Sequence, residues 1–301
     1  MSASQFGPLV IIANSRSGHR QLSRAEAALR DAGLGYRVVL TAGPGHATEA
    51  AWKALLDGTR YLVAAGGDGT VHEVVNGMLR EDHPVAKDAV LGVLPMGSGC
   101  DFVRSFGIPR RAGDAVRHLT GDAVRQIDVG KVTFGTGQVR YFVNIAEAGL
   151  GGSVVAKAAR LPGRLSSIRY FAGFWMALPG FRRCAARMDV DGHESRWPAA
   201  LNVVVANCQF YGGGMRVSPK SDPADGALEV LAMTGPKHVA CTTLPQIYLG
   251  RHLPHRYIAE FRACRVRLDT DLPLPIEADG EVLGTTPATF EIIPGAIQLK
   301  I

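Results

Sequence analysis

The sequence predicts an α/β domain built on a parallel sheet, followed by a mostly antiparallel β domain. The chain has 301 residues, which at about 100–200 residues per domain indicates two domains. Strand and helix patterns alternate in its first part, whereas longer strand patterns dominate after about residue 125. Because no tandem repeat or low-complexity linker marks the change, we place the boundary where the period shifts. We therefore expect domains at residues 1–125 and 126–301.

Four apolar runs in the first domain are each followed by a helical pattern. We expect strands at Leu9–Asn14, Tyr36–Thr41, Arg60–Ala65 and Val90–Pro95, and helices at Gln21–Ala32, Ala47–Leu56, Val71–Leu79 and from Asp101 onward. Strands that are apolar throughout and alternate with helices form parallel sheets covered on both faces. Ligands of such sheets bind at the carboxyl ends of the strands, which is where glycine-containing turns occur in this sequence.

Longer β-patterned runs make up the second domain. We expect strands at Val139–Ile145, Ala185–Val190, Leu201–Ala206, Ala227–Met233, Ile258–Leu268 and Thr289–Ile293. Asp191-Gly192 and Asp279-Gly280 are typical turn dipeptides. Helical patterns interrupt the strands around Ser153–Leu178 and, after Pro236, at His238–Leu249.

Composition limits the class of protein. Hydrophobic residues make up 47% of the chain and charged residues 20%, so it can bury a sizeable core. The net charge of +6 suits an anionic substrate or a membrane surface better than nucleic acid, and we expect no nucleic-acid partner. The 5 cysteines include no C-x-x-C pair, so neither a disulfide framework nor a zinc knuckle is indicated and a reducing, cytoplasmic setting fits.

The apolar segments indicate at most peripheral membrane contact. No basic leader precedes the apolar run Leu9–Ala13, so we expect no signal peptide. The longest apolar stretch, Tyr170–Phe181, is interrupted by Gly173 and Pro179 and is shorter than the ~20 residues needed to cross a bilayer. We expect a cytoplasmic protein with transient contact at the inner face of the membrane.

The most specific motif is Gly66–Thr70 (GGDGT), directly after a buried strand and before a helix. Its glycines let the backbone come close to a ligand, and the helix N-terminus presents N–H groups to an anion, which favours phosphate binding. Asp68 would repel a phosphate if unaccompanied, so it indicates a magnesium ion or a donor hydroxyl nearby. A tight structural turn is the alternative explanation.

Two further turns, Asn14–Gly18 and Pro95–Asp101, occupy equivalent places after strands. Together the three turns predict a sheet edge rich in backbone donors, with the hydroxyls of Ser17, Ser98 and Thr70 available to phosphate. The P-loop and dinucleotide fingerprints are absent from the sequence, as are the serine-hydrolase and zincin motifs.

These motifs resemble the diacylglycerol kinase catalytic-domain family, which includes sphingosine and ceramide kinases and soluble bacterial lipid kinases. The similar segments are Gly66–Gly77, Pro95–Pro109, Phe142–Gly152, Gly212–Pro219, Asp225-Gly226 and Asp279-Gly280-Glu281. The resemblance implies a Rossmann-like α/β nucleotide-binding domain and a C-terminal antiparallel β-sandwich domain for the lipid substrate. It also implies an active site in the interdomain cleft, and the last residues of the chain are allowed to return to the first domain.

The resemblance further implies the residues of the site. Contacts to ATP fall on Asn14, Ser17, Gly18, Thr41, Gly66, Gly67, Asp68, Gly69, Thr70, Val71, His72, Glu73, Gly97 and Ser98. The catalytic residues implied are Glu281 as proton acceptor with Asp68, Asp101 and Asp279. A structural Mg²⁺ is implied at Asp225 with the carbonyls of Asp222 and Ala227, and Cys100 departs from the family pattern by replacing an asparagine.

A carboxylate at Glu281 has a physical use in such a reaction. A lipid hydroxyl is a poor nucleophile at neutral pH, and phosphoryl transfer requires in-line positioning, charge neutralisation by magnesium and a base for the proton. Asp279-Gly280 is also a strong hairpin signal by itself, so a plain turn is the alternative.

Basic and aromatic residues alternate between Lys157 and Arg187. The basic ones are Arg160, Arg164, Arg169, Arg182 and Arg183, and the apolar ones are Leu161, Leu165, Phe171, Phe174, Trp175 and Met176. Such a segment suits contact with an anionic membrane surface. The interpretation we favour for most of these residues is that the aromatic side chains belong to the core and the arginines to a solvated face.

The sequence therefore predicts an ATP- and Mg²⁺-dependent lipid kinase that transfers the γ-phosphoryl group to a hydroxyl of a diacylglycerol, phosphatidylglycerol or sphingoid acceptor. One alternative is an NAD kinase-like enzyme, which shares the GGDGT loop, and another is a non-catalytic lipid or nucleotide sensor. The joint presence of Asp68, Asp225, Asp279 and Glu281 favours an enzyme. The expected partner is the lipid substrate, and a homodimer is left open.

Overall fold

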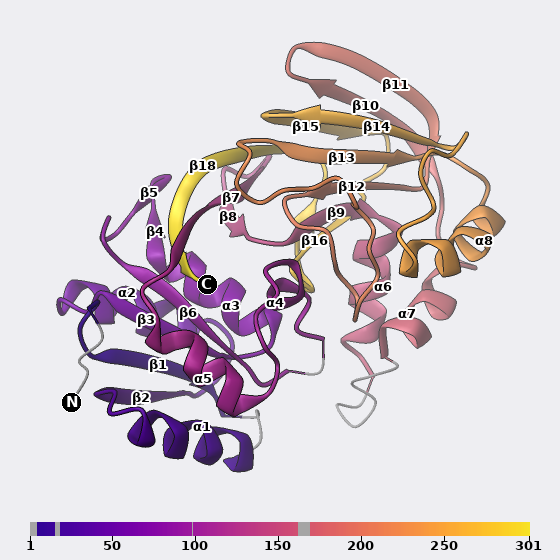
Figure 1. Cartoon of the computed structure of the whole chain (residues 1–301). Helices are drawn as coiled ribbons and strands as arrows, with labels where there is room; N and C mark the ends of the chain where they lie inside the picture. Colours follow the sequence, from indigo (N-terminus) through magenta and orange to yellow (C-terminus); the bar gives the residue numbers. More distant parts are fainter. Residues whose placement is uncertain (1–4, 16–18, 98, 162–168) are drawn as a thin grey trace. The chain divides into compact units, whose positions relative to one another are not determined.

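The structure, a computed structural model, describes residues 5–15, 19–97, 99–161 and 169–301 (Figure 1). The chain forms two compact units. The first consists of the residues up to Val129 together with Pro294–Ile301, and the second of Gly130–Ile293. The chain therefore leaves the first unit after Val129 and returns to it with its last residues.

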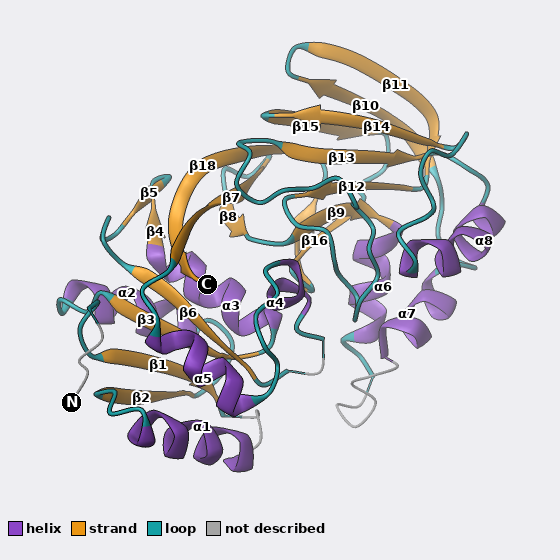
Figure 2. Ribbon diagram, in the orientation of Figure 1, coloured by secondary structure: helices purple, strands orange, loops and turns teal. Residues whose placement is uncertain are grey.

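The first unit contains the predicted parallel sheet. Its strands are β1 (Leu9–Asn14), β2 (Tyr36–Thr41), β3 (Tyr61–Gly66), β6 (Val90–Pro95) and the end of β18 (Ala288–Lys300). β1 lies between β2 and β3, β6 follows beside β3, and β18 pairs with β6, all in parallel. β1, β3 and β6 are almost fully buried because helices cover both faces of the sheet (Figure 2).

Among its described residues, five helices and one short hairpin complete this unit. They are α1 (His19–Asp31), α2 (His46–Leu56), α3 (Asp68–Met78), α4 (Asp101–Ser105), α5 (Ala112–Thr120), and the pair β4 (Leu79–Arg80) and β5 (His83–Pro84). Leu29 of α1 and Leu119 of α5 pack in one core with Ile11 and Val63 of the sheet. α2 and α3 pack on each other and on the sheet. Helix α4 ends after little more than one turn, with Gly107 and Pro109 following.

The second unit is the antiparallel β-sandwich. Its strands are β7 (Val124–Phe134, from Gly130 on), β8 (Val139–Phe142), β9 (Ile145–Gly149), β10 (Cys184–Val190), β11 (His193–Ala200), β12 (Asn202–Ala206), β13 (Leu228–Met233), β14 (Ile258–Ala263), β15 (Arg265–Thr270), β16 (Pro275–Ala278), β17 (Glu281–Thr285) and the start of β18. One sheet has the order β14-β13-β12-β9-β16-β17, and the other contains β11, β10, β15, β18, β7 and β8. Side chains of both sheets, among them Val205, Ile276, Met188 and Phe290, form one core.

Two predicted strands are wrong in extent. Ile258–Leu268 is divided at Cys264 into β14 and β15, and Val139–Ile145 is divided after Phe142 into β8 and β9. In both cases the two parts belong to different sheets of the sandwich. The alternating pattern of side chains continues across such a change of sheet, so it does not reveal the break.

Three helices lie outside the sandwich core. They are α6 (Leu150–Ala158), α7 (Arg169–Ala177) and α8 (Lys237–Tyr248). α6 and α7 pack against each other. The helical pattern predicted around Ser153–Leu178 thus gives two helices, and residues 162–168 between them lie outside the described residues.

Candidate functional site

The predicted glycine-containing turns of the first unit lie at one edge of its sheet. In the register of the strands, Asn14 pairs with Thr41, and Gly66 pairs with Pro95. β1 and β3 are also in register, so the carboxyl ends of four neighbouring strands coincide. We call this edge, with Asn14, Thr41, Gly66–Thr70 and Pro95–Gly97, the rim. Ser17, Gly18 and Ser98, which the sequence also assigns to it, lie outside the described residues.

The turns after β3 and β6 contact each other through their backbones. The carbonyl of Gly66 accepts the amides of Met96 and Gly97 at 2.8 and 3.2 Å. A Cβ on Gly97 would lie 2.5 Å from the Cα of Gly67, and a Cβ on Gly66 would lie 2.2 Å from the hydroxyl oxygen of Thr70. Glycine is thus required at 66 and 97 by the packing of the turns themselves, whether or not a ligand binds there.

Asp68 joins the same two turns through hydrogen bonds to α4. Its carboxylate accepts the backbone N–H of Asp101 at 3.2 Å and of Phe102 at 3.0 Å. The side chain of Cys100, the N-cap residue of α4, does not cap the helix. Asp68, which is far from α4 in the sequence, caps it instead. These two amides explain an acid inside a glycine turn without requiring a metal ion.

Cys100 has a defined contact in place of the family's asparagine. The backbone of Cys100 has a left-handed conformation, with φ of 53°. Its Sγ donates to the carbonyl of Gly97 at 3.2 Å. Burial is the main cause that raises the pKa of the Cys100 thiol, and the charge of Asp68 adds to it. The thiol therefore stays protonated and ties the turn after β6 to the start of α4.

The carboxylates of Asp68 and Asp101 lie beside Gly99, and Asp101 also forms an ion pair with Arg104 at 3.5 Å. An added Cβ at Gly99 would lie 3.2 Å from an oxygen of Asp68 and 3.8 Å from one of Asp101, so both carboxylates border the space that glycine leaves. Mg²⁺ is bound in many sites by one or two carboxylates together with substrate phosphates. In the ranges that the structure describes, no group of three His, Cys, Asp or Glu side chains could hold a metal by itself.

The remaining predicted nucleotide residues differ in their surroundings. Val71 and His72 are buried in α3. Glu73 binds the N-terminus of α2, because its carboxylate oxygens accept the amides of Gly45 at 3.0 Å and Ala47 at 2.9 Å. The carboxylate of Glu73 thus has a structural task that a pattern within GGDGTVHE does not reveal.

The hairpin of the second unit presents Glu281. Asp279 and Gly280 form its two-residue turn with φ of 51° and 89°, as a type I′ turn requires, and Ala278 pairs with Glu281. Glu281 is the exposed first residue of β17. The predicted turn is therefore present, and it carries an acidic side chain at its exit.

Asp279 fastens this turn to the segment between β8 and β9. Its carboxylate accepts the N–H groups of Val143, Asn144 and Ile145 at 3.0, 2.9 and 3.2 Å. Its own N–H donates to the carbonyl of Ile145 at 3.0 Å. Because Asp279 is buried and its oxygens accept three backbone amides, these contacts support a positioning role rather than direct proton transfer.

A pair of buried acids beneath the turn was missed by the sequence analysis. Glu147 of β9 lies directly opposite Glu277 of β16, and each is 2% exposed. Burial raises the pKa of Glu147 to about 7, and burial with the charge of Glu147 raises that of Glu277 well above its ordinary value. The sequence signal that could have revealed this pair is a single acidic residue inside each of two short apolar strands, IAEAG and PIEA.

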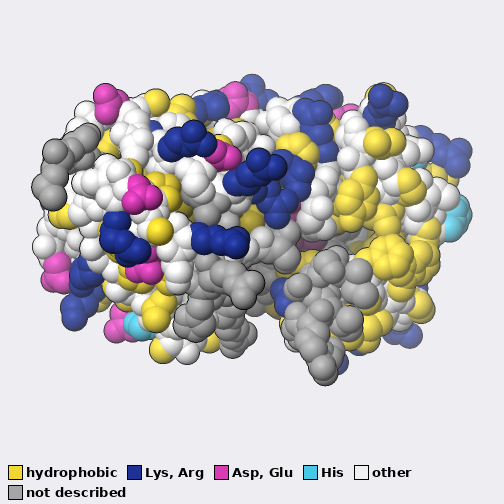
Figure 3. Space-filling model, turned by 60° about the horizontal axis from the view of Figure 1, so that its bottom comes forward, with side chains coloured by type: hydrophobic (Ala, Val, Ile, Leu, Met, Phe, Trp, Pro, Cys, Tyr) yellow, Lys and Arg dark blue, Asp and Glu magenta, His cyan; other side chains and the backbone are white. Residues whose placement is uncertain are grey.

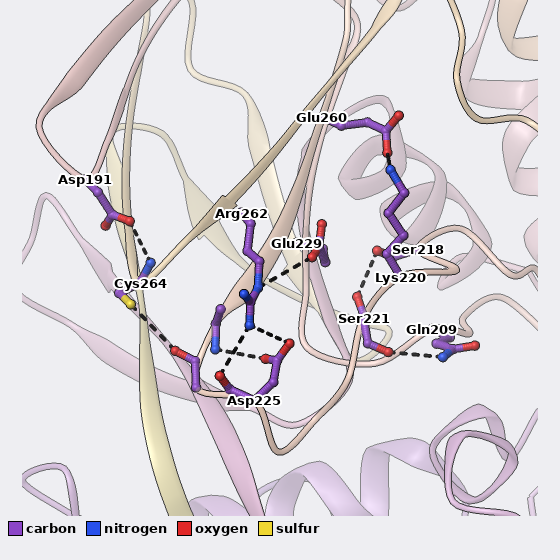
Figure 4. Close-up of polar contacts among 12 residues, drawn as sticks. Asp191, Gln209, Ser218, Lys220, Ser221, Asp225, Glu229, Glu260, Arg262 and Cys264 are labelled. Carbon is purple, nitrogen blue, oxygen red and sulfur yellow. Dashed lines mark hydrogen bonds and ion pairs between the residues drawn. The ribbon is translucent and has the colours of Figure 1, made fainter.

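The side chains expected near the structural Mg²⁺ make other polar contacts in this structure (Figure 4). The carboxylate of Asp225 accepts the amide of Ala227 at 3.1 Å and forms an ion pair with Arg262 at 2.8 Å. Arg262 also lies 3.9 Å from Glu229, and Asp222 accepts the amide of Ala224 at 3.2 Å. A guanidinium thus stands beside the carboxylate that was expected to hold the metal, and it would repel a divalent cation.

Helix α7 exposes hydrophobic side chains on the second unit. Phe171, Trp175 and Met176 are 57, 49 and 50% exposed, and Figure 3 shows hydrophobic side chains gathered on the side of the molecule that carries α7 and α8. Trp175 stacks edge-on with Phe171 and Phe174. The interpretation of the aromatic side chains as core is wrong for Phe171 and Trp175. Among the described residues, no helix has the length and apolar character needed to cross a membrane.

Profiles of two known protein domains match the chain. The diacylglycerol kinase catalytic domain matches residues 8–132, and the YegS C-terminal NAD kinase beta sandwich-like domain matches residues 144–301. A diacylglycerol kinase of Bacillus subtilis (strain 168) is 31% identical over 290 residues, which cover 93% of this chain and 91% of that protein. A diacylglycerol kinase of Mycobacterium tuberculosis is 27% identical over 311 residues, covering 99% of this chain and 98% of that protein.

Solved structures agree with the fold. A crystal structure of a diacylglycerol kinase from Bacillus anthracis str. Sterne matches with a TM-score of 0.73 at 21% identity. The match covers 99% of this chain and 97% of the other. The two-unit architecture is therefore shared with a known protein along almost the whole chain.

Proposed function

Because the chain belongs to the diacylglycerol kinase family and is a lipid kinase, we propose that it transfers the γ-phosphoryl group of ATP to a hydroxyl of a membrane lipid. The family implies ATP as the phosphoryl donor. The observation that carries the finer proposal is the rim, where glycine turns meet at the carboxyl ends of four strands. Such an edge is the usual ligand site of a parallel α/β sheet.

The rim is proposed to bind the polyphosphate of ATP. Gly67 is the N-cap residue of α3 and Gly69 lies in its first turn, where helix N–H groups and the helix dipole favour negative charge. Asn14 and Thr41 end the neighbouring strands and are proposed to contact the nucleotide beside them. Asp68 and Asp101 would hold Mg²⁺, which when bound neutralises charge on the phosphates.

Glu281 is proposed as the proton acceptor. In the reaction the lipid hydroxyl oxygen forms a bond to the γ-phosphorus, the bond from that phosphorus to the β-phosphate oxygen of ATP breaks, and the hydroxyl proton passes to the carboxylate of Glu281. ADP and the phosphorylated lipid leave. The proposal requires Glu281 and the bound nucleotide to act on the same lipid molecule.

The acceptor is proposed to be diacylglycerol, phosphatidylglycerol or a sphingoid base. The test is incubation of the protein with γ-labelled ATP, Mg²⁺ and each of these lipids, with NAD as a further acceptor. We expect label in a lipid and none in NAD. Label in NAD alone would indicate an NAD kinase-like enzyme, and ATP binding without any transfer would indicate a sensor.

Helix α7 is proposed to contact the membrane that contains the acceptor. Its exposed Phe171 and Trp175 are residue types found on the apolar face of helices that lie at a membrane surface. Replacing both by serine should weaken binding to phosphatidylglycerol vesicles by about 100-fold, since burying each large apolar side chain contributes about 1.5 kcal/mol or more and about 1.4 kcal/mol is a factor of ten. Leu56→Ser at the end of α2, 62% exposed in wild type, is the matched control and should leave vesicle binding unchanged. Equal binding by the double variant and the control would contradict this contact.

A further inference from the structure

Glu147 and Glu277 form a cross-strand pair inside the second unit. They are directly opposite each other on β9 and β16, and each is 2% exposed. Like charges in this arrangement are destabilising. In the part of the chain that the structure describes, neither carboxyl forms an ion pair with Lys or Arg.

Two carboxyl groups that face each other across neighbouring strands can form a hydrogen bond only when one of them holds a proton. Two ionised carboxylates this deep in the core would carry a large electrostatic penalty, which one shared proton removes. Asn202 fixes the direction of the pair, because its Nδ2 donates to Glu147 at 2.7 Å while its Oδ1 accepts the amide of Gly151 at 3.0 Å. Glu147 therefore accepts from Asn202, while the charge of Asp279 acts on Glu277 and favours the proton there.

The pair is connected directly to the turn before Glu281. A carboxyl oxygen of Glu277 accepts the N–H of Gly280 at 2.9 Å. The titratable groups that face the pair are Asp279, whose charge acts on Glu277, and the buried Tyr211, whose pKa burial raises most and the two carboxyls raise further. Asp279 holds one side of the turn through the amides of residues 143–145, and Glu277 holds the other through Gly280.

Room for the pair is created by glycine. A Cβ at Gly151, in the first turn of α6, would lie 1.8 Å from an oxygen of Glu147. The first turn of α6 therefore approaches the carboxyl group closely, and its amide groups favour negative charge on Glu147. This again assigns the charge to Glu147 and the proton to Glu277.

We propose that Glu147 and Glu277 share one proton and act as positioning residues, which fix the Asp279–Gly280 turn so that Glu281 is held where it can take the proton of the lipid hydroxyl. The inference rests on the proposed role of Glu281. The proposed role differs from a purely structural one because it requires a neutral hydrogen-bond donor at position 277. It therefore predicts that the neutral amide of glutamine can take over the function of Glu277.

The test compares Glu277→Gln with Glu277→Met. Gln donates to Glu147 and accepts from Gly280 as the protonated acid does, whereas Met keeps the approximate volume and does neither. We expect Glu277→Gln to retain most of kcat. Glu277→Met should lower kcat by about 10- to 100-fold, the range for a small displacement of a reacting group, with KM for ATP unchanged. Faster amide hydrogen exchange at Gly280 is expected only in the methionine variant.

The pH dependence of Tm is a second measurement, and a change in packing alone would not alter it. Burial and the charge of Glu147 raise the folded-state pKa of Glu277 well above its ordinary value, so the stabilisation from its bound proton is fully present below about pH 4 and is lost as pH rises toward that raised pKa. Glu277→Gln removes this titrating group, so the stability of the variant no longer falls with pH on that account. The Tm of Glu277→Gln minus that of wild type should therefore increase from about pH 5 to about pH 8.

The outcomes separate this inference from the proposed function. Wild-type kcat and Gly280 exchange in Glu277→Met would overturn the inference, and so would a glutamine variant as impaired as the methionine one. A Tm difference that is constant with pH would overturn the shared proton, even if the methionine variant does not fold. Undiminished transfer by Glu281→Gln, measured in parallel, would instead remove the proposed proton acceptor while leaving the exchange and Tm results to judge the pair.

Discussion

The turns at Asp191-Gly192 and Asp279-Gly280 have the same local geometry. Asp191 and Asp279 are left-handed, with φ of 48° and 51°. The carboxylate of Asp191 accepts the amides of Cys264 and Arg265 at 3.0 and 2.8 Å, and that of Asp279 accepts three amides after β8. Each aspartate thus binds the backbone at a point where the chain passes from one sheet of the sandwich to the other.

The surroundings of the two turns differ. Asp191 is exposed, and Figure 4 shows its contact with the backbone of Cys264 at the start of β15. Asp279 is buried, and the turn that it begins is also bound by Glu277. The dipeptide therefore determines the shape of the turn, whereas burial and the acid pair beneath it determine how rigidly the next side chain is held.

The largest expected difference between the turns is in stability. Asp279→Ala leaves three buried N–H groups without their acceptor and should cost about 3 kcal/mol or more of the free energy of unfolding. Asp191→Ala should cost about 1 kcal/mol or less, because water reaches its two amides. Urea unfolding of both variants measures the difference. Equal losses would show that burial does not distinguish the turns.

A smaller effect is expected beside the exposed turn, at Arg262. Removing an exposed ion pair costs at most about 1 kcal/mol, so Arg262→Ala should lower Tm only slightly. If the guanidinium takes the place of the expected structural Mg²⁺, adding EDTA should not change the Tm of the wild type. Mg²⁺ should raise the Tm of Arg262→Ala more than that of the wild type. A fall in wild-type Tm on adding EDTA would restore the metal site at Asp225.

Local patterns were sufficient for most of the fold. The alternation of strands and helices predicts the first unit, and the carboxyl ends of its strands coincide because parallel strands in register must end together. The position of the turn at Asp279-Gly280 also follows from two residues. These features depend on neighbours in the sequence, which a single chain displays directly.

Features made by distant residues were not predictable in this way. Glu73 binds α2, Asp68 binds α4, and Glu147 meets Glu277 across 130 positions of sequence, a separation given by their numbers. Each pairing depends on which elements become neighbours after folding. The exposure of Trp175 was missed for the same reason, since helical spacing does not say which face of α7 is covered.

The central claim is that the buried turn presents Glu281 as the proton acceptor of the kinase. The most direct measurement is the single-turnover rate of γ-phosphoryl transfer to the accepted lipid by Glu281→Gln at saturating ATP. His193→Ala, which changes the residue after the exposed turn, is the matched control. We predict a rate about 10²- to 10⁴-fold lower for Glu281→Gln with ATP affinity unchanged, and an unchanged rate for His193→Ala. Equal rates for Glu281→Gln and wild type would contradict the claim.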